Sequence, residues 1–293
     1  MGVKLQLAVE DSIFARHPEL SAGGFIAAGL GCLPAALTGA LERQALDLPS
    51  RAPGSLEALI ADERIVRWRE AIRQCGLKPS DFRGSVEQLL RRALADKPAH
   101  SQHPLVAAYC AISMRFVVPL GAYDIARLPH SGIRLRLARP SEDTFCPLGG
   151  QAERMPLSER IAVYAAGSTV LCYAYNFRDS EATGVQGDTD VAVFMGEVLS
   201  RPEHEALRSS LVALARLLAD AEPLDELRVQ VGVLALQVVE QAPALADEFQ
   251  EAAARVMVLR VALEVLGQVG DAFAENRHLN FGRSGIRAVG AVR

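Results

Sequence analysis

The stretch Pro119-Leu-Gly-Ala-Tyr-Asp-Ile-Ala-Arg-Leu128 lies where the sequence pattern changes in the middle of the chain. It follows the apolar run Leu105–Val118, and a Pro-x-Gly sequence at that point ends regular structure and turns the backbone. Beyond it, Gly132–Ala138 alternates apolar residues with Arg134 and Arg136, which predicts a half-buried strand. The stretch therefore predicts a corner between a buried helix and a strand. A structural corner and a functional one fit this local pattern equally well.

The composition is that of an ordinary soluble globular protein of 293 residues, with 50% hydrophobic residues and a formal net charge of −4. The acidic balance excludes a surface coated in basic residues, so any contact with nucleic acid would need a local cluster. Glu10 and Asp11 stand where a signal peptide stays apolar. The glycine-rich run Ala22–Leu41 is broken by Pro34 and predicts buried loop and helix, not a membrane span. We expect a cytoplasmic protein with no membrane contact.

The reactive residue types are dispersed along the chain. The five cysteines include no Cys-x-x-Cys pair, so neither a disulfide framework nor a zinc ribbon is expected. Cys110 and Cys172 lie in apolar surroundings and are predicted core residues. The sequence holds no glycine loop that would cradle a phosphate and no Ser/His/Asp arrangement. We therefore expect neither a metal nor a cofactor.

Hydrophobic periodicity predicts an α+β fold. Lys4–Val9 alternates like a strand, and Ile161–Ala165 with Thr169–Asn176 predicts a hairpin around Gly167. One helix is expected to begin at Ser85, with Gln88 completing a capping box. Further helices are predicted over Ala36–Leu48, Ser55–Cys75 and Pro104–Val118.

From Pro202 onward, leucine, alanine, valine and paired charges predict three amphipathic helices, Glu203–Asp220, Leu224–Glu240 and Leu245–Gly267. We therefore expect a substrate-pocket domain over residues 1–200 and a helical C-terminal extension over residues 201–293. The apolar faces of the last two helices predict a homodimer formed through the extension.

Seven short motifs over roughly residues 60–200 give the sequence a family resemblance. They are Gly76–Pro79, Ser85–Arg92, His103–Val106, Pro119–Asp124, Ile133–Arg136, Pro147–Gly150 and Arg178–Thr183. In this order they resemble the paired B3/B4 module of the phenylalanyl-tRNA synthetase beta subunit, and more closely the stand-alone bacterial proteins built on that module. The resemblance implies a mixed α/β domain that hydrolyses tRNA charged with the wrong aromatic amino acid. Its partner would be an amino acid or an aminoacyl-tRNA.

The resemblance also implies roles for particular residues. Glu181 falls where the editing site has a glutamate that recognises the tyrosine hydroxyl, and Thr183 falls in the adjoining loop. Two positions depart from the family pattern, because Cys110 replaces an asparagine and Gly121 replaces a histidine. These departures point to a different substrate or a different reaction.

The residue types themselves predict a polar pocket. The loop Arg178–Thr183 can place a guanidinium, which binds a carboxylate through two hydrogen bonds, beside carboxylates that can hold an ammonium. A carboxylate in an apolar cavity has a raised pKa and can act as a general base on a positioned water. The predicted catalytic residues are Glu181 and Glu87. The predicted substrate-binding residues are Arg73, His103, Gly121, Tyr123, Asp124, Arg178 and Thr183.

Three functions remain open at this level. The first is a stand-alone hydrolase of mischarged aminoacyl-tRNA, for which Arg83, Arg91, Arg92 and Lys97 would supply a basic surface. The second is a small-molecule enzyme that reuses the pocket, for example in a Pictet–Spengler-type condensation of an aromatic amino acid or amine with a carbonyl partner. The third is a non-catalytic binding protein. The arginines also fit a solvated helix face on which Glu87 pairs with Arg91.

Overall fold

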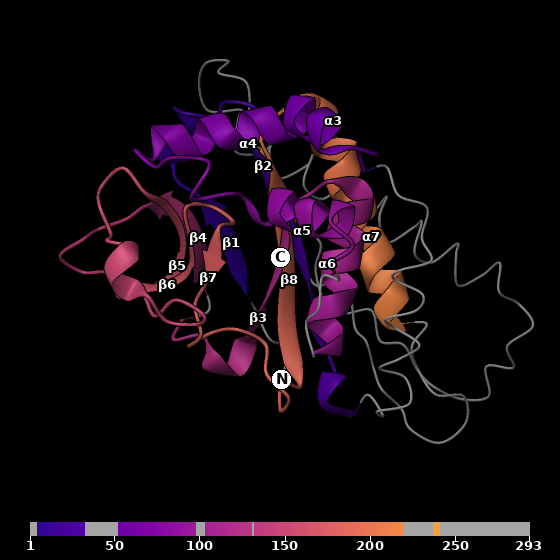
Figure 1. Ribbon diagram of the computed structural model, residues 1–293. Helices are drawn as coiled ribbons and strands as arrows, with labels where there is room; N and C mark the ends of the chain where they lie inside the picture. The colour runs from indigo at the N-terminus through magenta and orange to yellow at the C-terminus, as the bar shows by residue number, and fades with distance from the viewer. Residues whose placement is uncertain (1–4, 33–51, 98–102, 131, 220–236, 241–293) are drawn as a thin grey trace, which may run out of the picture. The chain divides into compact units, whose positions relative to one another are not determined.

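The computed structural model describes residues 5–32, 52–97, 103–130, 132–219 and 237–240 (Figure 1). The chain divides into two compact units, Met1–Pro243 and Ala244–Arg293, and every described residue lies in the first. This unit extends past the boundary predicted at residue 200. The predicted helices Ala36–Leu48 and Leu245–Gly267 lie outside the described residues, as does most of Leu224–Glu240. The dimer contact expected from the last two of these helices therefore stays a prediction.

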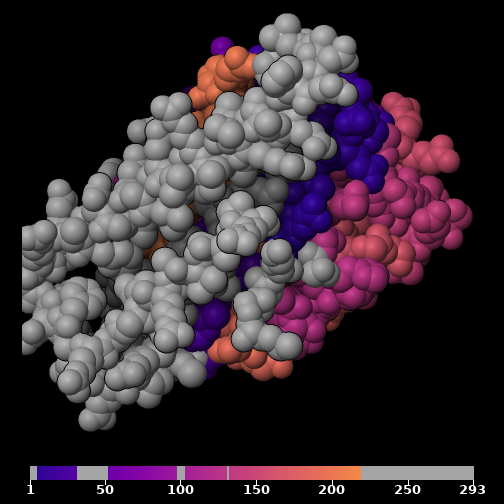
Figure 2. All heavy atoms as spheres, turned by 180° about the vertical axis from the view of Figure 1, so that it is seen from behind, coloured from indigo at the N-terminus to yellow at the C-terminus, as the bar shows by residue number. Residues whose placement is uncertain are grey.

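Two β-sheets form the centre of the first unit (Figure 1). The first has the order β1-β4-β5-β6-β7, with strands Gln6–Val9, Gly132–Leu137, Ala162–Ala166, Thr169–Tyr173 and Arg178–Asp179. The second has the order β3-β8-β2-β9, with strands Leu120–Asp124, Val191–Val198, Ser21–Ala28 and Gln237–Glu240. All neighbouring strands are antiparallel except β1 and β4. Figure 2 shows the N-terminal residues in indigo beside the magenta residues of the first sheet.

The helices cover one face of the second sheet and one end of the unit. Helices α6 (Pro104–Phe116) and α7 (His204–Ala219) pack on the face of the second sheet that is turned away from the first. Helix α5 (Ser85–Leu94) lies beside α6, and α3 (Leu56–Ala61) and α4 (Glu63–Gln74) run across one end (Figure 1). The short elements are α1 (Asp11–Phe14), η1 (Leu30–Cys32), η2 (Ile125–Arg127), η3 (Ala152–Arg154) and η4 (Arg201–Glu203). Together with the sheets, these helices confirm the predicted α+β class.

Alternating side chains of the second sheet divide the hydrophobic core in two. On β8, Val193 and Met195 join the core between the sheets, whereas Phe194 joins the core beneath α6 and α7. Phe194 stacks on Phe25 of β2, with 5.2 Å between the ring centroids. Because both faces of these strands are buried, their sequences are continuous apolar runs without polar alternation. Helix α7 contributes to the second core and lies within the first unit.

Several predicted elements are present. Strand β1 occupies most of Lys4–Val9, and β5 and β6 form the predicted hairpin, with Gly167 at a φ of 61°. The apolar segment before the corner is helix α6, which ends when Val117 adopts a left-handed backbone conformation.

The prediction for Ala22–Leu41 was wrong over its first part, because Ser21–Ala28 forms the interior strand β2. Glycines are uncommon in strands and hid this element. One of them has a steric reason: a Cβ at Gly24 would lie 2.5 Å from the carbonyl oxygen of Phe194 on β8. Close approach of two strands therefore explains the glycine.

Three helix predictions were wrong in detail. The helix expected over Ser55–Cys75 is interrupted at Asp62, whose Oδ1 accepts a hydrogen bond from the Arg64 backbone N–H at 2.9 Å and begins α4. Ser85 is not the cap of α5, because Gly84 holds that position. Gln237–Glu240 is strand β9, paired with β2, although a helix was predicted there.

Arg136 was predicted to lie on the polar side of β4, and this was also wrong. The side chain is buried and donates two hydrogen bonds to Asp143, at 2.6 and 2.8 Å. It donates further bonds to the carbonyl oxygens of Leu137 and Gly167. These acceptors compensate a guanidinium that the alternating pattern alone would expose to water.

Arg136→Met is expected to destabilise the protein by about 3–5 kcal/mol, because it leaves the Asp143 carboxylate buried without its counter-charge. Urea unfolding monitored by circular dichroism measures this loss. The double variant Arg136→Met/Asp143→Leu should recover much of it, since both charges are then absent. Equal destabilisation by the single and double variants would contradict this account of the pair.

Candidate functional site

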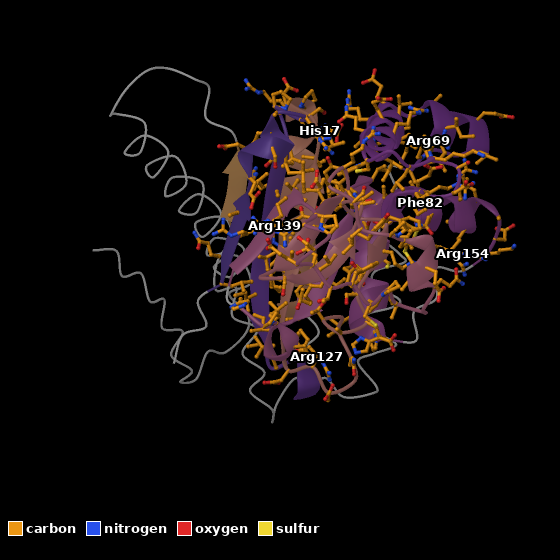
Figure 3. All side chains as sticks on the ribbon, turned by 90° about the vertical axis from the view of Figure 1, so that its left-hand side faces the viewer. His17, Arg69, Phe82, Arg127, Arg139 and Arg154 are labelled. Atoms are coloured by element: carbon orange, nitrogen blue, oxygen red, sulfur yellow. The ribbon has the colours of Figure 1, made fainter. Side chains whose placement is uncertain are left out.

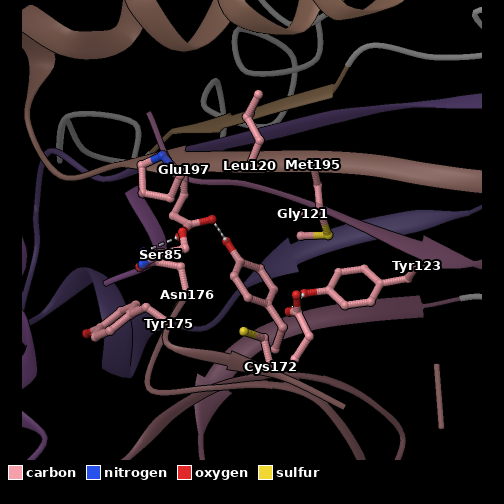
Figure 4. A pocket seen from close by; sticks show the side chains of 12 residues that line it. Ser85, Leu120, Gly121, Tyr123, Cys172, Tyr175, Asn176, Met195 and Glu197 are labelled. Carbon is pink, nitrogen blue, oxygen red and sulfur yellow. Dashed lines mark hydrogen bonds between the residues drawn. The ribbon is translucent and has the colours of Figure 1, made fainter. Parts of the chain in front are cut away.

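A small cavity opens between the two sheets, beside the N-terminus of α5 (Figure 4). Its empty volume, opening included, is about 310 Å³. Residues of five strands, the loop after β6, the corner before β3 and α5 line it. They are Ser85, Pro119, Leu120, Gly121, Tyr123, Tyr164, Cys172, Tyr175, Asn176, Asp179, Met195 and Glu197.

The pairing of β3 with β8 places four of these residues on one face. Gly121 lies opposite Met195 in the register, and Tyr123 and Glu197 follow at the two-residue spacing that returns a side chain to the same face. That face is turned toward the first sheet, as the membership of Tyr123 and Met195 in the core between the sheets shows. Strand pairing therefore delivers Glu197, the one charged residue of the eight-residue strand β8, into the space between the sheets.

Glu197 is buried and held by two neutral donors. The Tyr164 hydroxyl donates to Oε2 at 3.0 Å, and the Asn176 side-chain Nδ2 donates to Oε1 at 2.9 Å (Figure 4). Burial raises the pKa of Glu197 to about 7, while the two hydrogen bonds oppose the rise and the nearby Asp179 adds to it. A carboxyl group with this pKa can take up and release a proton at neutral pH.

Asp179 is a second carboxylate in the cavity, and burial raises its pKa as well. Its Oδ1 accepts a hydrogen bond from the Tyr123 hydroxyl at 3.1 Å, and the Cys172 thiol is a further hydrogen-bonding neighbour. Burial raises the pKa of Cys172 well above its usual range, so this thiol stays protonated and is not a nucleophile.

The two tyrosine–carboxylate hydrogen bonds run in opposite directions between the sheets. Tyr164 of the first sheet donates to Glu197 of the second, and Tyr123 of the second donates to Asp179 of the first. Each sheet thus contributes one donor and one acceptor. Hydrogen bonds from neutral hydroxyl groups therefore hold both carboxylates.

The loop between β6 and β7 holds Asn176 in place through a strained backbone. Ala174 and Tyr175 adopt positive φ angles of 50° and 63°, which are costly for residues with side chains. The Tyr175 ring packs edge-on against Trp68 and His17, and its hydroxyl lies 2.9 Å from His17 Nε2. Burial lowers the pKa of His17 to about 4, so this histidine is neutral at pH 7. Packing of the ring therefore maintains the conformation that brings Asn176 to Glu197.

Of the described residues that line the cavity, two carry carboxylates and none is lysine or arginine. A compact cation, such as a protonated amine, is the ligand that this charge distribution favours. Across the described ranges, no three His, Cys, Asp or Glu side chains gather closely enough to hold a metal ion.

The structure brings two predicted substrate-binding residues, Tyr123 and Gly121, into the cavity. Asp124, adjacent to Tyr123, is turned away and caps η2, with its Oδ1 accepting from the Ala126 backbone N–H at 2.8 Å. Its other oxygen accepts from Thr189 at 2.8 Å and from Arg127 at 3.2 Å. Asp124 therefore holds the corner after β3.

The predicted catalytic residues lie outside the cavity lining. Glu181 is exposed on the loop that follows β7. Glu87 is buried on α5, where it accepts from Arg69 at 2.6 and 3.0 Å and from Arg91 at 2.8 Å. These guanidiniums overcome the cost of burial and lower the pKa of Glu87. Glu87 is therefore buried, whereas the sequence also allowed a position on a solvated helix face.

Four other predicted substrate-binding residues also lie away from the lining. Arg73 is exposed and paired with Glu70 at 2.9 Å. The His103 Nε2 lies 2.9 Å from the carbonyl oxygen of Gln186. Arg178 lies over the ring of Phe177, and Thr183 is buried, with its carbonyl accepting from the Asp124 backbone N–H. Functional roles for all four, and for Glu87 and Glu181, stay predictions.

Sequence reasoning missed Glu197, Asn176 and Tyr164. A single glutamate inside the apolar run Val191–Val198 was the available sign of Glu197, since a lone charge in a doubly buried strand needs compensation. No comparable sign marks Asn176 or Tyr164. Of the two predicted core cysteines, Cys172 is buried and lines the cavity, whereas Cys110 is half-buried on α6.

Comparison with known proteins gives a family match and a distant structural neighbour. Residues 67–204 match the family model of the B3/4 domain, and this range contains every residue that lines the cavity. An N-terminal fragment of the phenylalanyl-tRNA synthetase beta-subunit from Pyrococcus horikoshii is 14% identical, with a TM-score of 0.36 over 75% of this chain and 51% of that chain. The chain thus spans about half of that structure. No curated protein matches the sequence.

Replacing Glu197 by glutamine is expected to stabilise the protein above neutral pH. The folded-state pKa of about 7 lies above the 4.5 of an ordinary glutamate, so the native state holds the extra proton between these values. Wild-type stability should therefore fall as pH rises through this window, by on the order of 3 kcal/mol. Glutamine does not ionise and escapes the loss.

Urea unfolding of wild type and Glu197→Gln at pH 5 and pH 8 measures the difference. Glu181→Gln is the matched control: Glu181 is exposed and this variant keeps Glu197, so its stability should fall between pH 5 and pH 8 as that of the wild type does. A wild-type protein that gains stability relative to Glu197→Gln between pH 5 and pH 8 would rule out the raised pKa.

Proposed function

We propose that this chain, whose residues 67–204 match the B3/4 domain model, hydrolyses the ester bond of an aminoacyl-tRNA in the cavity between its two sheets. The observation that carries the proposal is Glu197, a buried carboxylate fixed by Tyr164 and Asn176 with a pKa near neutrality. A general base needs this combination of fixed position and pKa near the working pH.

The amino acid enters with its ammonium group toward the acidic side of the cavity. Asp179 and Glu197 supply the negative charge, and no cationic side chain among the described lining residues repels the ammonium. The rings of Tyr123, Tyr164 and Tyr175 offer apolar surface for its side chain. The two carboxylates thus bind the ammonium group and the tyrosine rings contact the side chain, and many amino acids share both features.

The chemical step uses a water molecule as the nucleophile. Glu197 removes a proton from this water while the water oxygen forms a bond to the ester carbonyl carbon. Collapse of the tetrahedral intermediate breaks the bond to the ribose oxygen, and Glu197 returns the proton to that oxygen. The products are the free amino acid and deacylated tRNA, and no covalent enzyme intermediate forms.

A cationic cluster on α4, on α5 and in the loop between them provides a surface for the tRNA. Arg69, Arg83 and Arg91 all lie within 3.8 Å of the single carboxylate of Glu87, which leaves a surplus of positive charge. Arg83 is two residues from Ser85, which lines the cavity. Phosphates of an acceptor stem can therefore meet guanidinium groups close to the bound ester.

Deacylation of a panel of tRNAs charged with non-cognate amino acids tests the reaction. Glu197→Gln should reduce the deacylation rate by roughly 10²–10⁴-fold, because the variant keeps the shape of the side chain and loses its basicity. The wild-type rate should rise with pH to a plateau above about pH 7, where Glu197 is ionised. Glu181→Gln is measured in parallel, and a loss confined to that variant would move the catalytic role to Glu181.

Arg83→Gln is expected to weaken the binding of every tRNA tested. It should also make the slope of the logarithm of the binding constant against the logarithm of the salt concentration shallower by about one. Arg139→Gln removes the same charge at a position that lies apart from Phe82, the neighbour of Arg83 (Figure 3), and serves as the control. Titrations at several salt concentrations give both slopes. Identical slopes for the two variants would place the RNA elsewhere.

The cavity also supports a second candidate, an enzyme that acts on a free amine. Two carboxylates with raised pKa can bind an ammonium and then accept its proton, as an amine needs before it condenses with a carbonyl compound in a Pictet–Spengler-type reaction. Absence of salt-sensitive tRNA binding, together with stabilisation by free aromatic amines, would favour this candidate. Ligand binding without any turnover would leave the non-catalytic alternative.

A further inference from the structure

Ser85 lines the cavity, but the reaction described above gives its hydroxyl no role. The Oγ atom is buried, and it has no hydrogen-bond partner within the described part of the chain. A buried hydroxyl without a partner is unfavourable. Serine commonly begins a helix because its oxygen caps the first turn, yet here Gly84 occupies the cap position and Ser85 follows it. The hydroxyl therefore serves neither the helix nor a neighbouring side chain.

The position of Ser85 is fixed by the same residue that holds Glu197. The Ser85 backbone N–H lies 3.0 Å from the Asn176 carbonyl oxygen and 3.1 Å from its side-chain Oδ1, while the Asn176 Nδ2 donates to Glu197. Gly84 makes this approach possible, because a Cβ there would lie 2.8 Å from Asn176 Oδ1. One asparagine thus places a buried hydroxyl and a buried carboxylate at the same cavity (Figure 4).

We infer that Ser85 donates a hydrogen bond from Oγ to the acyl oxygen of the substrate, while the acidic groups hold its ammonium. This inference rests on the proposed function and narrows its substrate class. The cavity takes α-amino acyl compounds, in which a single carbon separates the ammonium nitrogen from the carbonyl group. An amine of the same size without the carbonyl leaves the hydroxyl unpaired and binds more weakly.

A donor at this position also assists the reaction. Negative charge develops on the acyl oxygen when water attacks, and a fixed hydroxyl that points to this oxygen stabilises the transition state more than the ground state. Removing one such donor typically lowers kcat by roughly 10²–10³-fold. Ser85 would then be a catalytic residue that contacts the reacting group.

Two probes of matched shape test the binding claim without tRNA. Phenylalaninamide carries an ammonium and a carbonyl oxygen, whereas phenethylamine carries only the ammonium. The wild-type protein should show the larger rise in melting temperature with phenylalaninamide. Ser85→Ala should lose this preference and keep its response to phenethylamine, and Ser85→Thr, which retains a hydroxyl, should restore part of the preference.

The unliganded variant separates a substrate contact from a structural role. Ser85→Ala should melt no lower than the wild type, because it removes a buried hydroxyl that lacks a partner, and its deacylation kcat should fall by at least tenfold. A lower melting temperature with the ligand preference intact would overturn the inference, as would an unchanged kcat. A wild-type protein that prefers phenethylamine would overturn it too.

The outcome is distinguishable from failure of the proposed function. If Glu197→Gln deacylates tRNA as fast as the wild type, the general-base proposal fails, while the amide preference still reports on Ser85. If Glu197→Gln is inactive and Ser85→Ala is fully active with an unchanged ligand preference, only the inference about Ser85 fails.

Discussion

The constraint on which the rest of the site depends is the burial of a carboxylate between two sheets without a positive partner. Glu197 is 3% exposed, and its oxygens are compensated by the Tyr164 hydroxyl and the Asn176 amide. Neutral donors satisfy the hydrogen bonds of a carboxylate but do not neutralise its charge, so the pKa rises toward neutrality. In the reciprocal hydrogen bond, the Tyr123 hydroxyl of the second sheet donates to Asp179 of the first, so a neutral donor compensates this buried carboxylate too. Loss of either tyrosine would leave a buried oxygen unpaired, which ties the packing of the sheets to the state of the site.

Other buried carboxylates of the same unit show what the alternative looks like. Glu87 is compensated by Arg69 and Arg91, and its pKa is lowered; Asp143 is bound by two hydrogen bonds from Arg136. Glu87 therefore stays ionised at neutral pH, and both ion pairs contribute to the architecture. A carboxylate with charged partners is thus suited to structure, and one with neutral partners is suited to proton transfer. This difference in partners separates the candidate site from the ion pairs around it.

The backbone beside the cavity adopts a strained conformation, which lowers stability and persists because tertiary contacts hold it. Two consecutive non-glycine residues, Ala174 and Tyr175, hold positive φ angles, and the aromatic contacts of Tyr175 with Trp68 and His17 keep them there. The strained loop delivers Asn176, which in turn orders the start of α5. Strain of this kind is usual where a side chain must be held in one orientation. The part of the chain that matches the B3/4 domain contains Asn176 and the whole cavity lining, Gly121 included.

The sequence by itself determined the elements whose patterns are local, the hairpin around Gly167 and the helix before Pro119. Its motifs also predicted the resemblance that the B3/4 domain match over residues 67–204 supports. It also identified Tyr123 and Gly121, because they sit in the corner that follows that helix. It could not assign β2, whose glycines reflect a close approach to β8 from far along the chain. Nor could it decide which buried carboxylate has a raised pKa, because burial and partners depend on strands distant in sequence. Glu87 and Glu197 are both buried glutamates in amphipathic or apolar segments, and only the tertiary structure gives arginines to the first and neutral donors to the second.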